Sequence, residues 1–179
     1  GGADYWDDSG SLRYLRVEFA GAAIDDTSDH LPCITLQGVG SGTAVDYVQV
    51  HACYDDGIKF HGGTVNASHL VLTHVENDSL DWNYGFRGKL QYILVVQNPD
   101  PVAPADKAIS IENFEDNHNA YLRTAAKVAN ATLIGQGTET AIDINEGAGG
   151  FFTNMVIHGF AECLDIDDDA TFMIAGGPG

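Results

Sequence analysis

Short runs in which apolar and polar residues alternate return along this chain at a nearly constant interval. Residues 45–50 align with residues 67–72 and with residues 90–95, at offsets of 22 and 23 residues. Alternation is the pattern of a β-strand, and a repeat of this length is typical of a solenoid in which every coil contains the same short strands. The pattern therefore predicts a β-helix.

The repeat continues beyond these three copies in both directions. The longer strand returns at residues 12–17, 129–134 and 152–157, and a shorter strand occurs at residues 34–36, 58–60, 80–82, 109–111, 142–144 and 164–166. We therefore predict an all-β fold, a right-handed parallel β-helix of about six coils. The longer intervals place loop insertions at residues 25–30, 98–106 and 115–127, and the last of these is the one segment expected to form a short helix.

The alternation also separates residues that face the core from residues that face outward. In the shorter strand the outward column is Thr35, Lys59, Asp81, Ser110, Asp143 and Asp165. In the longer strand the predicted outward column becomes apolar over four coils, at Val71, Leu94, Leu133 and Val156. An apolar stripe on an outer face needs a cover. One of the chain's own insertions could supply it, or the stripe could be an interface with a partner or a sister subunit.

Net charge narrows the classes of partner. Eight basic residues against 26 acidic residues give a net charge of −18. Repulsion at long range disfavours nucleic acid and anionic membranes as partners, and it disfavours polyanionic substrates unless a bound cation reverses the local field. No run is long and apolar enough to span a membrane. The length fits one domain over residues 1–179, which we read as a piece of a longer secreted protein because both ends are Gly-rich and no initiator Met is present.

The three cysteines give no metal-binding pattern. Cys33, Cys53 and Cys163 lack the CxxC spacing of structural zinc or of c-type haem. Cys33 and Cys163 fall in equivalent places of the first and last coils, too far apart for a disulfide. We expect three free and largely buried thiols.

Acidic turns recur in adjacent coils and form the first candidate site. Asp55 and Asp56 precede one short strand, and Asn77 and Asp78 precede the next. Stacking would bring these side chains within about 5 Å of one another. Carboxylates at that separation share a proton, bind a cation or cap the turn backbone. Calcium, which takes several oxygen ligands, is the candidate ion, and turn capping is the simpler alternative.

A second acidic group lies near the end of the chain, where Asp143, Asp165 and Asp167 fall in neighbouring coils. These residues are further candidate calcium ligands. A solvated acidic face would have the same appearance in the sequence.

Lys59 and Asp81 form a candidate catalytic pair, with Arg87 further along the same coil. A lyase acting on a uronate polymer would use Lys59 or Arg87 as the base and a calcium ion on Asp78 and Asp81, whereas a hydrolase would use two carboxylates. The simpler interpretation is a favourable cross-strand charge pair.

The segment DDGIKFHGGTVNASHLVLTHVENDSLDWNYGFRGKLQYILV, preceded by GSGTAVDYVQV, resembles a repeat of secreted bacterial surface proteins and lipoproteins. The opening strand SGSLRYLRVEFAG is similar to that of the same group. The resemblance implies export and a right-handed parallel β-helix of the pectate-lyase-like superfold. It implies no particular reaction, because that superfold carries lyases, hydrolases and non-catalytic proteins.

We therefore expect an extracellular or cell-surface bacterial protein without enzymatic activity, a matrix, adhesin-like or filament subunit stabilised by calcium. Its expected partners are further copies of itself or the remainder of a longer chain. The alternative is a carbohydrate-active lyase or hydrolase at the Lys59/Asp81 face. A third possibility is a glycan-binding module in which exposed Trp6, Tyr54 or Tyr84 forms the platform.

Overall fold

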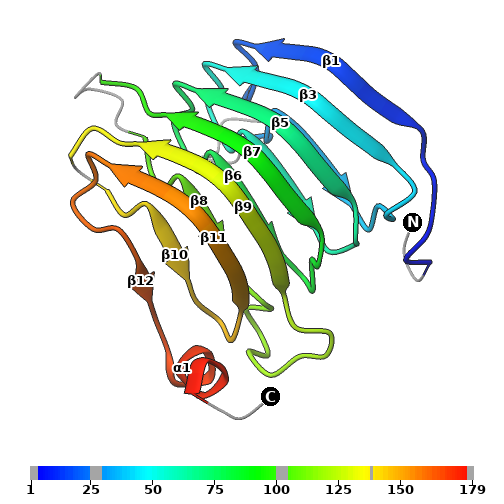
Figure 1. Cartoon of the computed structure of the whole chain (residues 1–179), viewed down its shortest axis with the longest axis vertical. Helices are drawn as coiled ribbons and strands as arrows, with labels where there is room; N and C mark the ends of the chain where they lie inside the picture. The colour runs from blue at the N-terminus through cyan, green and yellow to red at the C-terminus, as the bar shows by residue number, and fades with distance from the viewer. Residues whose placement is uncertain (1–3, 25–29, 100–104, 138, 177–179) are drawn as a thin grey trace.

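The computed structural model describes residues 4–24, 30–99, 105–137 and 139–176, and in it the chain winds through two parallel sheets (Figure 1). One sheet contains the long strands, in the order β1-β3-β5-β7-β9-β11, and the other contains the short strands, in the order β12-β10-β8-β6-β4-β2. The long strands are β1 (Ser11–Glu18), β3 (Ala44–His51), β5 (Asn66–Thr73), β7 (Lys89–Val96), β9 (Ala125–Ile134) and β11 (Gly149–His158). The short strands are β2 (Ile34–Gln37), β4 (Ile58–His61), β6 (Leu80–Asn83), β8 (Ile109–Ile111), β10 (Ile142–Ile144) and β12 (Asp165–Ile166).

Each coil contributes one long and one short strand, and equivalent residues of successive coils pair in parallel. Val48 pairs with Leu70, and Leu70 pairs with Ile93. The inward faces of both sheets pack into one core, where Phe60, Trp82 and Phe86 are fully buried. Burying one such aromatic side chain stabilises the fold by about 2–3 kcal/mol. The prediction of a parallel β-helix is confirmed.

Every long strand contains one residue in the left-handed backbone region, and these residues form a column on the outer face. The φ angles are 53° at Tyr14, 54° at Tyr47, 53° at His69 and 58° at Tyr92, and Asn130 and Asn154 follow at 55° and 52°. The first four rings stack, with centroids 4.9, 4.2 and 4.9 Å apart. Asn154 Nδ2 then donates to Asn130 Oδ1 at 2.6 Å. Contacts along this column offset the cost of a conformation that side chains other than glycine seldom adopt.

The predicted register of β9 is wrong by one residue. Leu90 pairs with Val128, and Leu94 therefore pairs with Thr132 rather than with Leu133. A shift of one residue moves a side chain to the opposite face of a sheet. Leu133 accordingly lies in the core and is fully buried, so it does not belong to the outer stripe.

The predicted helix within residues 115–127 is also wrong. The end of this segment enters β9, and the part before β9 is formed of turns. Among the described residues the helix is α1 (Asp169–Gly176), at the C-terminal end of the solenoid (Figure 1). The Thr171 N–H donates to Asp168 Oδ1 at 3.0 Å, which caps the first turn of α1. The predicted insertions at residues 25–30 and 98–106 lie largely outside the described residues.

The prediction of three free thiols is wrong as well, because Cys33 and Cys53 form a disulfide with their Cα atoms 6.0 Å apart. Equivalent repeat positions do not reveal this disulfide, because it joins different corners of neighbouring coils. The Cys33 N–H donates to the Asp56 carbonyl at 2.8 Å, which holds Cys33 against the turn that follows Cys53. Cys163 is free, and it is exposed rather than buried.

Candidate functional site

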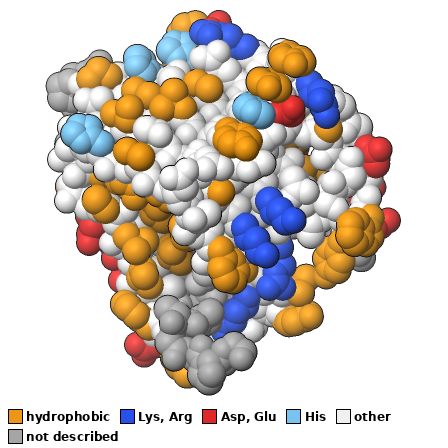
Figure 2. All heavy atoms as spheres, in the orientation of Figure 1, with side chains coloured by type: hydrophobic (Ala, Val, Ile, Leu, Met, Phe, Trp, Pro, Cys, Tyr) orange, Lys and Arg blue, Asp and Glu red, His pale blue; other side chains and the backbone are white. Residues whose placement is uncertain are grey.

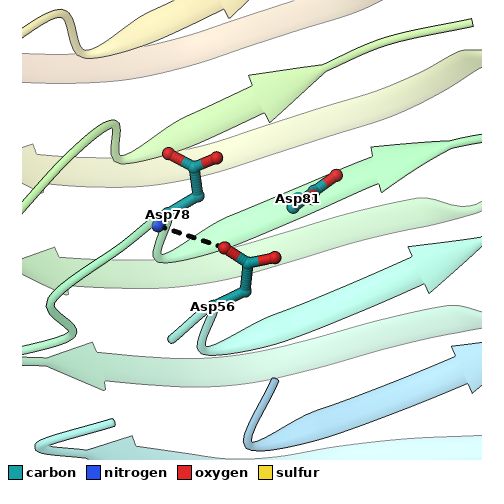
Figure 3. A group of neighbouring side chains, drawn as sticks. All are labelled: Asp56, Asp78 and Asp81. Atoms are coloured by element: carbon teal, nitrogen blue, oxygen red, sulfur yellow. Dashed lines mark hydrogen bonds between the residues drawn. The ribbon is translucent and has the colours of Figure 1, made fainter. Parts of the chain in front are cut away.

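Three aspartates from two neighbouring coils form a buried group of carboxylates beside the short strands. Asp56 and Asp78 occupy equivalent turns just before β4 and β6, and Asp81 lies on β6 itself (Figure 3). One carboxylate oxygen from each of the three lies within 4.8 Å of the others, and all three residues are buried. We call Asp56, Asp78, Asp81 and the adjacent Lys59 the ionic cluster.

The turns of the ionic cluster are held by hydrogen bonds to the carboxylates. Asn77 Nδ2 donates to Asp56 Oδ1 at 2.8 Å and to Asp55 Oδ1 at 3.2 Å. The Asp78 N–H donates to Asp56 Oδ1 at 3.3 Å (Figure 3). The Lys107 N–H donates to Asp78 Oδ1 at 3.0 Å. These aspartates therefore do cap the turns, and each cap links one coil to the next.

Lys59 provides the positive charge of the ionic cluster. Its Nζ donates to Asp56 Oδ2 at 3.0 Å and also contacts Asp81 Oδ2. Asp81 is 4% exposed although it belongs to the outward column of the short strands, and its Oδ1 is buried without a hydrogen-bond partner among the described residues. One ammonium thus lies between two carboxylates, with a third carboxylate close by.

Burial sets the protonation of the ionic cluster. Loss of solvation, with repulsion from Asp81, raises the pKa of Asp56 to about 6. Burial also raises the pKa of Asp78 well above its usual value, and burial raises the pKa of Asp81 despite the nearby Lys59 ammonium. Burial alone would lower the pKa of Lys59, but the Asp81 and Asp56 carboxylates raise it overall.

This geometry makes Lys59 a poor general base, because its ammonium is held protonated between two carboxylates. The structure brings Lys59 and Asp81 together, as the sequence predicted. Arg87 instead lies in the turn before β7, where its side chain lines a hollow with Trp6 and Tyr121. The candidate catalytic residues therefore divide between two places.

The other predicted ligands do not form a comparable group. Asp143 pairs with Asp165 on adjacent strands, and Asp167 follows on the exposed surface. Asn145 Nδ2 donates to Asp143 Oδ2 at 3.4 Å. Among the described residues, only Asp56, Asp78 and Asp81 bring three such ligand atoms together.

The predicted partner stripe is shorter than expected, because Leu133 faces the core. Val71 is half-buried, Leu94 is 36% exposed and Val156 is 57% exposed. Thr132 takes the place of Leu133 on the outer face, as the strand pairing requires. A polar residue therefore interrupts the apolar stripe.

The predicted glycan platforms are exposed but lie apart in the fold. Trp6 is 79% exposed, Tyr54 55% and Tyr84 50%. The Tyr54 ring contacts His30, with centroids 4.6 Å apart, and the Tyr84 ring stacks on His61 at 5.3 Å. Of the three, Trp6 lines a hollow together with Arg87.

One contact of the ionic cluster went unrecognised in the sequence. Lys59 was paired with Asp81 across strands, whereas its contact with Asp56 comes from the turn three residues earlier. The spacing of three residues between Asp56 and Lys59 indicates this contact, because a turn residue just before a short strand lies beside the first outward residue of that strand. Asp55 and Asn77, also predicted as ligands, bond to each other through the Asn77 amide.

No helix in the described ranges is long and apolar enough to cross a bilayer.

Comparison with known proteins gives one result that covers nearly the whole chain. No curated protein and no solved structure gives a significant match. A family model described as a pectate-lyase-like beta helix domain matches residues 1–176, in agreement with the two parallel sheets. The chain therefore belongs to the pectate-lyase-like β-helix domain family.

Proposed function

We propose that this chain is a non-enzymatic structural protein of the extracellular space or the bacterial cell surface, and that calcium stabilises its ionic cluster. The observation that carries the proposal is that the Lys59 ammonium lies between two carboxylates. Its ammonium is held between Asp56 and Asp81, so Lys59 stays protonated and does not supply the base that a lyase would need at this face. The same residues join two coils of the solenoid, which is a structural role.

A charge deficit in the ionic cluster supports the calcium part of the proposal. Three buried carboxylates face one ammonium, and the pKa of each carboxyl is raised. Buried carboxylates need a compensating charge, either protons or a cation. Calcium is a hard cation that takes carboxylate and carbonyl oxygens, and Asp81 Oδ1 is a buried oxygen without a partner among the described residues.

The disulfide between Cys33 and Cys53 supports the extracellular part of the proposal. Disulfides form and persist mainly in oxidising compartments such as the periplasm and the cell exterior. The acidic composition, with a net charge of −18, suits a soluble protein in a cation-rich medium.

The experiment is thermal unfolding at pH 7 in calcium and in EDTA. We expect calcium to raise the midpoint of unfolding by several degrees, because a ligand that binds only the folded state stabilises it. Asp78→Asn should abolish the calcium effect. Glu76→Gln, which removes a charge from the same turn outside the ionic cluster, should retain it. Equal midpoints in calcium and in EDTA for the unmodified protein would refute the calcium site.

A further inference from the structure

The eight basic residues divide into two sets of four. Each member of the first set has a carboxylate partner: Arg13 with Asp46, Arg16 with Glu18, Lys59 with Asp56 and Asp81, and Lys107 with Asp106. The second set is Arg87, Lys89, Arg123 and Lys127, and within the described part of the chain none of them has a carboxylate at ion-pair distance. In a chain with 26 acidic residues, four cations without an acidic partner are unexpected.

These four residues lie at one corner of the solenoid. Lys89 pairs with Lys127 at the starts of β7 and β9, so their Cα atoms are about 5 Å apart. Arg87 and Arg123 belong to the turns that lead into the same two strands. Figure 2 shows a group of Lys and Arg side chains, bordered by hydrophobic ones, on the face that carries the long strands. We call Arg87, Lys89, Arg123 and Lys127 the cationic corner.

Neutral groups hold part of the cationic corner in place. Arg123 Nη1 donates to the carbonyls of His118 at 2.9 Å and Gly147 at 2.6 Å, and Nη2 bonds to the Asn119 side chain. These acceptors orient the guanidinium without neutralising it. The Lys127 ammonium lies 5.5 Å from the centre of the Phe151 ring, which orients it without a carboxylate. The positive charge at this corner is therefore positioned and uncompensated.

Three adjoining hollows connect the four cations. Arg87 and Arg123 line a hollow of about 530 Å³, and Lys89 and Lys127 line a second of about 610 Å³ that shares Phe151 with the first. Arg87 also lines a third hollow, of about 400 Å³. Volumes of this size fit small ligands or segments of a polymer. Arg87 lines both the first and the third hollow and Phe151 lines both the first and the second, so the three hollows adjoin one another.

Exposed aromatic side chains border the same surface. Trp6 is 79% exposed and Tyr121 is 93% exposed, and both line the third hollow with Tyr5. Phe151 is 65% exposed and separates the other two hollows. Aromatic rings offer flat apolar faces with a polar edge, which suits a ligand that has apolar faces and polar substituents.

We propose that the cationic corner binds a polysaccharide chain that carries sulfate or carboxylate groups. Cations in two adjacent coils match anionic groups repeated along a polymer, and the aromatic side chains match the apolar faces of sugar rings. Arg and Lys bind both sulfate and carboxylate oxygens by charge-assisted hydrogen bonds. The net charge of −18 repels every polyanion at long range, so binding rests on the local charge of the cationic corner. Double-stranded nucleic acid, with one charge per ~1.7 Å of its axis, is repelled most strongly. The surface would attach the protein to an acidic glycan matrix without cleaving it.

The test measures binding by calorimetry in EDTA, so that calcium does not bridge the polymer to the ionic cluster. The probes are heparin as the sulfated chain, polygalacturonate as the carboxylated chain and dextran as the neutral chain, with polyglutamate and a single-stranded oligonucleotide as other polyanions. We expect binding of heparin, polygalacturonate or both, and which of them binds identifies the anionic group. Binding should weaken as salt is added.

A matched pair of variants shows where the polymer binds. Lys89→Gln with Lys127→Gln should weaken binding by about tenfold or more, the loss of two charge-assisted contacts. Arg13→Gln with Arg16→Gln changes the net charge equally but removes cations that already have partners, and it should leave affinity within about twofold. Thermal unfolding of both variants checks that each is folded.

Three outcomes would overturn the inference: no binding of either acidic polysaccharide, an equal loss of affinity in both double variants, or tighter binding of polyglutamate or the oligonucleotide. The last outcome would identify the corner as a surface for acidic proteins or nucleic acid. The calcium response of unfolding is measured without polysaccharide, so failure of this inference is distinct from failure of the proposed function.

Discussion

At the scale of single residues, Lys59 decides how the ionic cluster behaves with pH. Asp56 has a pKa of about 6 in the folded protein, above its ordinary value of 3.8. A carboxyl group whose pKa is raised by folding contributes stability below the unfolded value, and that stability is lost as pH rises through the folded value. The cluster therefore depends more on the Lys59 ammonium above pH 6, where Asp56 ionises, than it does in acid.

Lys59→Met should lower the free energy of unfolding by about 3 kcal/mol at pH 7, because it leaves buried carboxylates without their cation. The loss should shrink towards pH 4, where the neutral carboxyls need no cation. Denaturant unfolding of both proteins at several pH values measures this difference. A loss that is the same at pH 4 and pH 7 would mean that packing of the side chain, and not its charge, is what Lys59 contributes.

The chemistry of the ionic cluster was only partly predictable from single residues. The sequence placed Asp56 and Asp78 in equivalent turns because the repeat period fixes which residues stack. It could not show that Asp81 is buried although it lies in an outward column, where its carboxylate contacts the Lys59 ammonium. Nor could the sequence show that the cationic corner has no carboxylate partner among the described residues, since ion pairs between coils depend on turn geometry.

At the scale of elements, the left-handed column determines the register of the long strands. The column residue of each long strand takes no part in the parallel pairing, whereas the residues on either side of it do. Two residues therefore separate the inward positions Val45 and Val48. Aligning Asn130 with Asn154 would have given β9 its correct register, because asparagine tolerates the left-handed conformation better than most residues. Apolar positions alone put β9 one residue out of register and therefore place Leu133 on the outer face of the sheet.

Asn130→Ala should lower the free energy of unfolding by about 1–2 kcal/mol, because alanine at a φ of 55° is strained and the bond from Asn154 is lost. Asn130→Gly should cost less, since glycine adopts this conformation without strain. Chemical denaturation of the two variants gives the comparison. A glycine variant less stable than the alanine variant would show that backbone strain at this column is unimportant.

At the scale of the whole molecule, the repeat period was enough to predict the fold. Two strands per coil and six coils follow from recurring apolar positions, because parallel pairing stacks equivalent residues. The disulfide between Cys33 and Cys53 was missed, because it joins different corners of two coils rather than equivalent positions. Helix α1 was missed because the acidic run before it reads as a turn, although Asp168 is a favourable N-terminal cap.

The architecture holds two separate groups of charged residues, one buried and one exposed. The ionic cluster lies along the short strands and joins coils, whereas the cationic corner lies at the starts of β7 and β9 on the long-strand sheet. Solenoids present extended surfaces of this kind because each coil adds one residue to every column. We therefore separate a structural role for the buried charges from a binding role for the exposed ones.

The most direct test of a non-enzymatic protein is the chain length of heparin and polygalacturonate after prolonged incubation with it in calcium, measured by size-exclusion chromatography. We predict that neither polymer shortens and that no new chain ends appear, because Lys59 is not free to act as a base. Progressive shortening by the purified protein, absent from a boiled control, would contradict the account.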